Sequence, residues 1–311
     1  MFSKKKIRII THSGTFHLDE AFAIATLKMF FKKKYKKSFF GPKFEIIRTR
    51  DLSVVKDGDY VIDIGGENDS NKLIFDHHQI GGAGKRENGI PYASFGLLWK
   101  EFGEKICDSK EIFRKVDEKI VQPIDAMDNG INLYDLKNPR TAPYLLYDLA
   151  ATYNFLSEYN GNKPMQSFLK MLNLTESILS KEIERAVIQE KQRKKILEIY
   201  NSTEDKKLII FDEDYDDFVI DETLNQFQEP IFVIKPNSGE NKEWKIKVIR
   251  KTMGSFEAKK DLPLAWAGKR DKDLEEVTGI KGVIFCHNKR FIAVANSREA
   301  ILKLAELALE G

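Results

Sequence analysis

The chain has 311 residues, of which 42% are hydrophobic and 32% are charged, and its formal net charge is +3. This length predicts two domains, because a single hydrophobic core rarely grows beyond about 250–300 residues. The composition is typical of a globular protein with a substantial core. A net charge this small does not by itself indicate a nucleic-acid partner.

The cysteines and the apolar runs narrow the class of protein further. The two cysteines, Cys107 and Cys286, lie outside any Cys-x-x-Cys pattern. Their spacing excludes a disulfide scaffold and a thiolate zinc finger, and it favours a reducing cytoplasm. No apolar run approaches the roughly 20 residues that span a bilayer, and the basic start leads into a short strand rather than a signal-peptide core. We therefore expect a cytoplasmic protein without a membrane partner.

The first half of the chain alternates strand and helix patterns. A β-branched run at 7–10 predicts a buried strand, and a polar loop after it leads into a helix expected over about 18–34. Further strands are predicted at 44–49, 60–64 and 72–75. This alternation predicts an α/β domain over 1–160 that is doubly wound around a mainly parallel sheet.

The second half of the chain predicts a long helix and a smaller domain. From residue 92 to about 150 the pattern is helical, and the charged stretch 164–200 repeats its apolar residues with the helical period. We expect a connecting helix within 161–200, and a smaller α+β domain over 201–311 that ends in a helix from Ser297. Its strands are expected at 207–211, 231–234, 244–249, 282–285 and 291–294.

Histidines and carboxylates gather at the ends of the predicted strands. Four of the five histidines fall within the first 78 residues. The residues at three strand ends are His12, His17 and Asp19, then Asp63, then Asp76, His77 and His78. Because an open α/β sheet binds ligands outside the carboxyl ends of its strands, three such ends would aim these side chains into one crevice. The sequence therefore predicts a metal site.

The residue types also indicate which metal and which chemistry to expect. Carboxylate and imidazole ligands without thiolate favour Mn²⁺ or Mg²⁺, with Zn²⁺, Fe²⁺ and Co²⁺ as alternatives. The set exceeds what one tetrahedral zinc uses, and two ions sharing a bridging carboxylate serve in-line displacement at phosphorus. We expect a phosphoester hydrolase with two Mn²⁺ ions. The alternatives are a small-molecule phosphatase or pyrophosphatase and a metal-binding interaction protein without turnover.

Simpler roles exist for single members of this set. Asp63 alone could cap a turn, Asp76 alone could cap a helix, and a lone histidine at a strand end is usually a surface residue. Adjacent side chains rarely share one metal cleanly, so His78 is interpreted as a residue that contacts the phosphate or a metal ligand. We assign His78 and Asp76 to the catalytic residues and the other strand-end residues to the metal.

Longer motifs around these residues resemble a known family. The segments His12-Ser-Gly-Thr-Phe-His17-Leu-Asp19-Glu20, Val61-Ile-Asp63-Ile-Gly-Gly66 and Phe75-Asp76-His77-His78-Gln79 look like the melanocyte proliferating gene family. Further matching segments lie at 94–103, 124–130 and 262–268, so the resemblance covers nearly the whole chain. That family is similar to the DHH phosphoesterase superfamily of RecJ-type exonucleases, oligoribonucleases and manganese pyrophosphatases.

The resemblance implies a DHH-type catalytic domain, a C-terminal substrate domain and, for part of the family, a 3′-to-5′ exonuclease acting on RNA. An older label for the family is metal-dependent protein hydrolase. The implied metal ligands are His12, His17, Asp19, Asp63, His77 and one of Asp125 and Asp128. Asp128 is preferred because Asp128-Asn129-Gly130 resembles the Asp-Thr motif of the superfamily, whereas Asp125 is equally well a carboxylate on a helix surface.

The substrate side is predicted from basic and glycine-rich segments. The run 81–84 with Lys85 and Arg86 could cradle a phosphate, or it is an ordinary mobile loop. Arginines suit bidentate contacts to phosphate. The predicted substrate-binding residues are Lys85, Arg86, Ser94, Lys269, Arg270, His287 and Arg290, with a hairpin tip as the simpler role for His287. We expect a single-stranded nucleic acid or oligonucleotide, RNA or DNA, as the substrate, and a homo-oligomer stays open.

Overall fold

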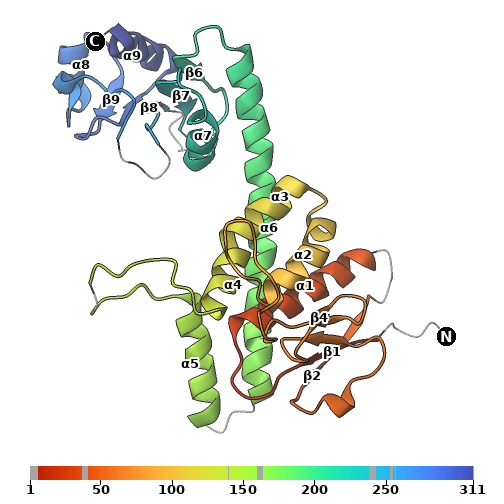
Figure 1. Cartoon of the computed structure of the whole chain (residues 1–311). Coiled ribbons are helices and arrows are strands. Elements are labelled where there is room, and N and C mark those ends of the chain that lie inside the picture. Colours follow the sequence, from red (N-terminus) through yellow and green to blue (C-terminus); the bar gives the residue numbers. More distant parts are fainter. Residues whose placement is uncertain are drawn as a thin grey trace. The chain divides into compact units, whose positions relative to one another are not determined.

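The computed structural model describes residues 6–36, 41–138, 140–159, 164–237, 243–252, 255 and 257–310. It contains two compact units, Met1–Val187 and Ile188–Gly311, each with its own sheet (Figure 1). The boundary lies within helix α6 (Pro164–Ser202). Sheets with helices in both units confirm a mixed α/β protein, while the DHH-type assignment and the domain limits at 160 and 200 stay predictions. Among the described residues, no helix has the length and apolarity needed to cross a membrane.

The sheet of the first unit has the strand order β2-β1-β3-β5-β4. Its strands are β1 (Lys6–Thr11), β2 (Lys43–Arg48), β3 (Tyr60–Ile62), β4 (Asn68–Asp69) and β5 (Ile74–Phe75). The four strands β2, β1, β3 and β5 run parallel, and only the edge strand β4 is antiparallel. The carboxyl ends of β1, β3 and β5 therefore lie side by side at one edge of the sheet, as the sequence predicts.

Two of these strands are shorter than predicted. The strand expected at 60–64 ends at Ile62, because Asp63 has a φ of 59° and turns the chain out of the extended conformation. The strand expected at 72–75 begins only at Ile74, because Leu73 also has a positive φ of 61°. The first departure places Asp63 in a tight turn directly after β3.

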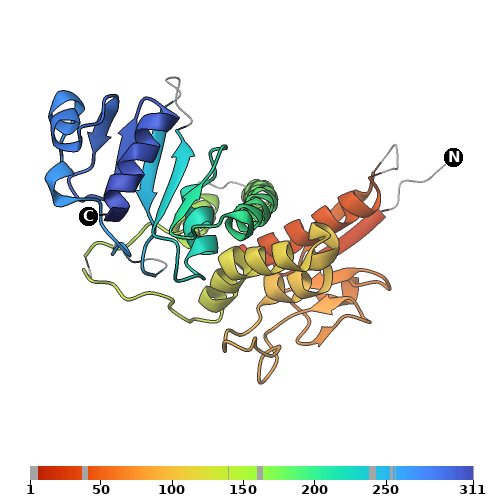
Figure 2. The same ribbon diagram turned by 90° about the horizontal axis from the view of Figure 1, so that it is seen from above.

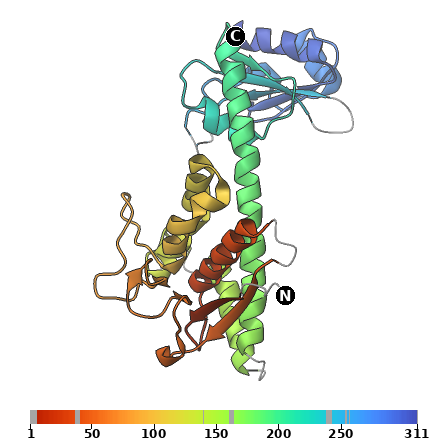
Figure 3. The same ribbon diagram turned by 90° about the vertical axis from the view of Figure 1, so that its right-hand side faces the viewer.

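Helices α1 (Leu18–Lys34) and α2 (Ser94–Cys107) pack side by side in the first unit (Figures 2 and 3). Helix α1 buries residues on almost every side, and the rings of Phe22 and Phe95 stack across the contact with centroids 5.0 Å apart. Helix α3 (Lys110–Val116), the π-helical turn Asp117–Val121 and helix α4 (Gln122–Asp128) follow in the chain.

The prediction that residues 92–150 are helical throughout is wrong between α4 and α5 (Leu146–Tyr159). The described residues between these two helices form turns and irregular backbone. Gly130, with a φ of 74°, ends α4, and Pro143 cannot donate the backbone hydrogen bond that a helix interior needs.

The second unit is built on the sheet β6-β7-β8-β10-β9, in which only β6 and β7 are parallel. The strands are β6 (Leu208–Ile210), β7 (Phe232–Pro236), β8 (Trp244–Val248), β9 (Val283–Cys286) and β10 (Ile292–Ala295), close to their predicted positions. The final helix α9 (Arg298–Glu310) confirms the helix predicted from Ser297. Helices α7 (Asp217–Leu224) and α8 (Asp271–Thr278) were not predicted, because each has only eight residues and a pattern of apolar residues that short does not distinguish a helix.

The two faces of this second sheet have separate cores. Ile234 of β7 packs in a cluster with Ile301 and Leu304 of α9, whereas its neighbour Val233 packs with Val219 of α7. Because successive side chains of a strand point to opposite faces, α9 and α7 cover opposite faces of the sheet.

The close contact between α2 and α3 yields a stability prediction. A Cβ atom at Gly103 would lie 2.7 Å from the Trp99 ring and 2.8 Å from the Phe113 ring. Overpacking costs about 1–3 kcal/mol, while alanine gains up to about 1 kcal/mol in helix propensity. We therefore expect Gly103→Ala to lower the free energy of unfolding by about 1–2 kcal/mol, measured by chemical denaturation. The exposed Glu104→Ala is the control, and equal stability of the two variants would contradict the packing.

Candidate metal centre

The ends of three neighbouring parallel strands and the ends of two helices supply one cluster of acidic and imidazole side chains. His12 directly follows β1, Asp63 directly follows β3, and His77 lies two residues after β5. Asp19 lies in the first turn of α1, and Asp128 is the last residue of α4. In the part of the chain that the structure describes, three groups have ligand atoms within 4.8 Å of one another: His12, His17, Glu20 and Asp63; Asp63, His77 and His78; and Asp19, His77 and Asp128.

Asp63 belongs to two of these groups and presents one carboxylate oxygen to each of two histidines. Its Oδ2 lies 3.3 Å from Nε2 of His12, and its Oδ1 lies 3.3 Å from Nε2 of His77. The Oγ of Ser94 donates a hydrogen bond to Oδ1 at 3.1 Å. Because Asp63 is only 2% exposed, its orientation is fixed by these contacts rather than by water.

Glu20 completes the group around His12, and sequence reasoning did not assign it. Its Oε1 lies 3.2 Å from Nε2 of His12, and its carboxylate also accepts the backbone N–H of His17 at 2.8 Å. That second contact is half of a capping box at the start of α1. The only sequence signal was an acidic residue beside Asp19 in the first helical turn, which is common on exposed helices as well.

Asp19 and Asp128 form the third group of ligand atoms together with His77. The Oδ2 of Asp128 lies 3.1 Å from Nε2 of His77. The two oxygens of Asp19 accept the backbone N–H groups of Ser94 and Phe95 at 2.9 and 2.7 Å. These amides open α2, where unpaired N–H groups and the helix dipole favour an anion.

The donor atoms of the cluster fit a cation. Among the described residues, Nε2 of His12, Nε2 of His77 and Oδ2 of Asp63 are buried and make no hydrogen bond. Buried polar atoms are normally paired, yet the two imidazole nitrogens lie only 3.1–3.3 Å from carboxylate oxygens of Asp63 and Asp128. Mixed imidazole and carboxylate donors suit divalent first-row metals and Mg²⁺-like ions. The cluster could therefore hold metal ions.

The charges of the cluster are strongly coupled. Burial lowers the pKa of His12 and His77, but their neighbouring carboxylates outweigh it and raise the two values to about 10 and about 11. Burial and the charges of Asp128, Asp63 and Asp125 raise the pKa of Asp19. Burial raises the pKa of Asp63, but His12 and His77 prevail and lower it. Without a metal, the two imidazoles supply the positive charge that the carboxylates need.

Asp76 and His78 form a pair beside the cluster. Asp76 is 1% exposed, and its Oδ1 accepts the backbone N–H groups of His77 and His78 as well as Nδ1 of His78 at 2.7 Å. Its Oδ2 accepts the N–H of Gly66 at 2.6 Å. Asp76 thus shapes the turn after β5, while the side chain of His78 is 58% exposed with Nε2 left for another partner.

Asp125 and Arg86 lie together outside the three groups. The Oδ2 of Asp125 is 2.8 Å from Nη1 of Arg86, and its Oδ1 accepts the N–H of Gly96 at 2.9 Å. Burial raises the pKa of Asp125 to about 7 against the opposing effect of Arg86. Arg86 also pairs with Asp117 at 3.0 Å. The structure therefore places Asp128 rather than Asp125 beside His77, and it engages Arg86 in internal ion pairs.

The remaining predicted substrate residues have varied surroundings. Ser94 is buried beneath Asp63, whereas Lys85 is exposed. In the second unit, Arg290 donates to the carbonyl of Leu262 and to Asp261, so it holds a loop of that unit. The guanidinium of Arg270 lies 5.0 Å from the centre of the Phe285 ring. Nδ1 of His287 accepts the backbone N–H of Lys289.

Two residues that the sequence did not indicate hold the loop between His12 and His17. Arg48, at the end of β2, donates to the carbonyl of Gly14 at 2.9 Å, and its guanidinium lies 4.6 Å from the centre of the Phe168 ring. Asn154 of α5 bonds to both the N–H and the carbonyl of Phe16. The Asn154 contacts join residues 138 positions apart, which no local pattern reveals.

The hydrogen bond from Arg48 to the loop between His12 and His17 predicts an effect on metal binding. Replacing Arg48 by Met removes the bond to Gly14, so His12 and His17 lose their fixed spacing. We expect affinity for Mn²⁺ to fall roughly 10–100-fold, as for other residues that orient metal ligands. Isothermal titration of Arg48→Met beside the exposed Arg50→Met checks this result. Unchanged affinity in a folded Arg48→Met protein would assign Arg48 to packing alone.

The raised histidine pKa values predict how metal binding depends on pH. Both values lie above the ordinary 6.5, so the metal-free chain keeps both protons at neutral pH and loses them only as pH rises through about 10 and about 11. A metal-bound imidazole must be neutral. Binding through His12 and His77 should release roughly two protons at pH 7, and affinity should rise with pH. Calorimetry in two buffers of different ionisation enthalpy measures this release, and binding without proton release would count against these two ligands.

Known proteins resemble the chain over nearly its full length. The family model MYG1_exonuc, described as an uncharacterised protein family (UPF0160), matches residues 8–309. The chain is 30% identical to a protein named MYG1 exonuclease from Homo sapiens, over 97% of this chain and 85% of that protein. It is 29% identical to MYG1 proteins from Schizosaccharomyces pombe and Dictyostelium discoideum, which it covers to 98% and 95%. The chain therefore belongs to the MYG1 family.

Proposed function

We propose that this chain is a metal-dependent phosphodiesterase that removes nucleotides from the 3′ end of single-stranded nucleic acid, with RNA as the preferred substrate. The observation that carries the proposal is the buried carboxylate of Asp63, whose two oxygens face two different imidazoles at 3.3 Å. A relative from Homo sapiens bears the name MYG1 exonuclease, which supports a nuclease activity.

The proposed site holds two ions, with Mn²⁺ as the preferred metal. One ion would be held by His12, His17 and Glu20, the other by Asp19, His77 and Asp128, and Asp63 would bridge them. When bound, such a pair lowers the pKa of a water and neutralises charge on the phosphoryl oxygens.

The residues around the ligands orient them and handle protons. The N–H groups that open α2 fix Asp19, and the hydroxyl of Ser94 fixes Asp63. Asp76 accepts from Nδ1 of His78 and so sets the ring orientation. In the imidazolium form, which carries a second proton on Nε2, His78 would donate that proton to a phosphoryl oxygen or to the departing oxygen. Lys85 is exposed, and its backbone pairs with Pro91, three residues before α2. It would supply a cation for the substrate backbone.

The proposal predicts that turnover depends on Asp63. Asp63→Asn keeps the size of the side chain but removes the negative charge that faces both imidazoles. We expect it to lower kcat on a labelled oligoribonucleotide by at least 10³-fold (roughly 4 kcal/mol of transition-state stabilisation). Circular dichroism should show an unchanged fold, and the exposed Asp57→Asn is the matched control.

The substrate is identified by a panel assayed with Mn²⁺. The panel contains an oligoribonucleotide, an oligodeoxyribonucleotide, a dinucleotide and pyrophosphate. Release of mononucleotides from the 3′ end supports the proposal. Turnover of pyrophosphate alone would make the chain a small-molecule phosphatase, and absence of all turnover in a metal-loaded protein would leave a metal-binding interaction protein.

A further inference from the structure

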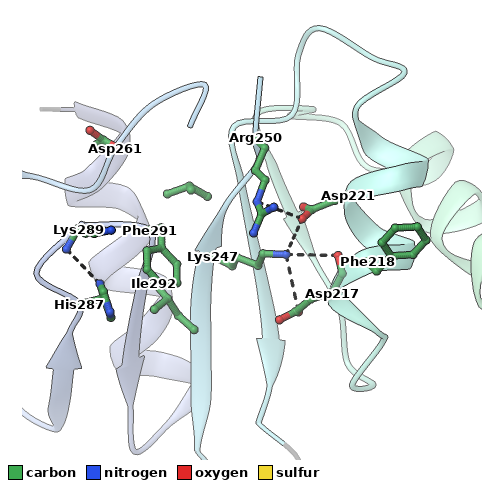
Figure 4. Close-up of a pocket in the computed structure, with 11 residues that line it drawn as sticks. Asp217, Phe218, Asp221, Lys247, Arg250, Asp261, His287, Lys289, Phe291 and Ile292 are labelled. Atoms are coloured by element: carbon green, nitrogen blue, oxygen red, sulfur yellow. Dashed lines mark hydrogen bonds and ion pairs between the residues drawn. The ribbon is translucent and has the colours of Figure 1, made fainter. Parts of the chain in front are cut away.

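The second unit contains a pocket of about 570 Å³ that is lined without any residue of the metal centre. Its lining residues come from α7, from β8 and the chain after it, and from the turn between β9 and β10 (Figure 4). Pockets of this size are typical of sites for small ligands and nucleotides.

One wall of the pocket is aromatic and apolar. Phe291 is 39% exposed, although it precedes a buried strand. The ring of His287 lies beside it, with centroids 4.3 Å apart, and Ile292 and Val248 extend the apolar surface. Exposed rings at a pocket wall offer a stacking surface to a flat ligand such as a nucleobase.

The acidic residues of the pocket already have cationic partners. Nζ of Lys247 lies 2.9 Å from Asp221, and the buried Lys235 pairs with Asp217 at 2.7 Å (Figure 4 shows the Lys247 contacts). The third lining carboxylate, Asp261, pairs with Arg290 at 2.6 Å. The negative charge of the lining is therefore compensated within the unit.

Lys289 adds positive charge to this balanced lining. It is exposed at the turn between β9 and β10, close in sequence to the aromatic wall. Within the described part of the chain, its ammonium pairs with no carboxylate, and only its backbone N–H is bonded, to His287. The ligand that this pocket favours is thus flat on one side and anionic at one end.

We propose that the pocket binds a nucleotide unit, with the base against Phe291 and the phosphate at Lys289. This inference rests on the proposed function, because each cleavage of a nucleic acid yields a nucleoside monophosphate. Two ligands could supply this nucleotide unit: the terminal nucleotide of a bound strand and the released mononucleotide.

Calorimetry on the full-length chain with EDTA tests this site without turnover. The probes are adenosine monophosphate, adenosine and inorganic phosphate. Phe291→Ala should weaken adenosine monophosphate and adenosine about tenfold or more, which is the scale of one lost base-stacking contact. Lys289→Met should weaken only the monophosphate. Phe291→Leu, which keeps an apolar side chain, should show a similar loss with an intact core, and the exposed Lys272→Met outside the pocket should bind as the unmodified chain does.

The two sources are separated by competition with a short oligoadenylate. Displacement of adenosine monophosphate by the oligonucleotide assigns the pocket to the strand, and binding of the monophosphate alone assigns it to the product; both support the site. No binding at millimolar concentration, or binding that Phe291→Ala and Lys289→Met leave unchanged, would overturn it. Nuclease assays with Mn²⁺ test the proposed function separately. An active enzyme that does not bind the monophosphate would overturn only the nucleotide-binding role of the pocket. Binding without nuclease activity would support that role but not the exonuclease activity.

Discussion

Burial of several carboxylates in one small volume is the constraint that organises the first unit. Asp19, Glu20 and Asp63 are almost inaccessible to water and lie around two imidazoles. Burying charges without partners is costly, and removing one partner leaves the others uncompensated. The fold meets this cost with N–H groups at the start of α2, with the hydroxyl of Ser94, and with the protons of His12 and His77. A divalent cation would replace those protons.

The arrangement of strands and helices follows from the same constraint. Parallel pairing of β1, β3 and β5 places the carboxyl ends of three strands side by side. The positive φ of Asp63 turns its carboxylate away from the paired strands immediately after β3. Gly96 lies in the first turn of α2 and leaves room for the carboxylate of Asp125, because a Cβ at this position would lie 1.8 Å from Asp125 Oδ2. The ion pair between Asp125 and Arg86 thus packs directly against α2, whose amides hold Asp19.

Much of this site could be predicted from the sequence because its signals are local. Runs of β-branched residues mark the strands, and His12, Asp63 and His77 follow those runs within two residues. Glu20 could not be distinguished from an exposed acidic residue of a first helical turn. The contacts of Arg48 and Asn154 join distant segments, so only the folded chain reveals them. Arg86 was predicted to bind substrate because it follows a glycine-rich segment. In the structure its guanidinium forms ion pairs with Asp117 and the buried Asp125, which no local pattern indicates.

We propose that Asp63 bridges two metal ions, and diffraction at the manganese absorption edge tests this bridge most directly. Crystals grown with Mn²⁺ should show two anomalous peaks, one between Asp63 and His12 and the other between Asp63 and His77. Two peaks on either side of the Asp63 carboxylate would establish the bridge. A fully occupied single peak, or peaks away from Asp63, would contradict it.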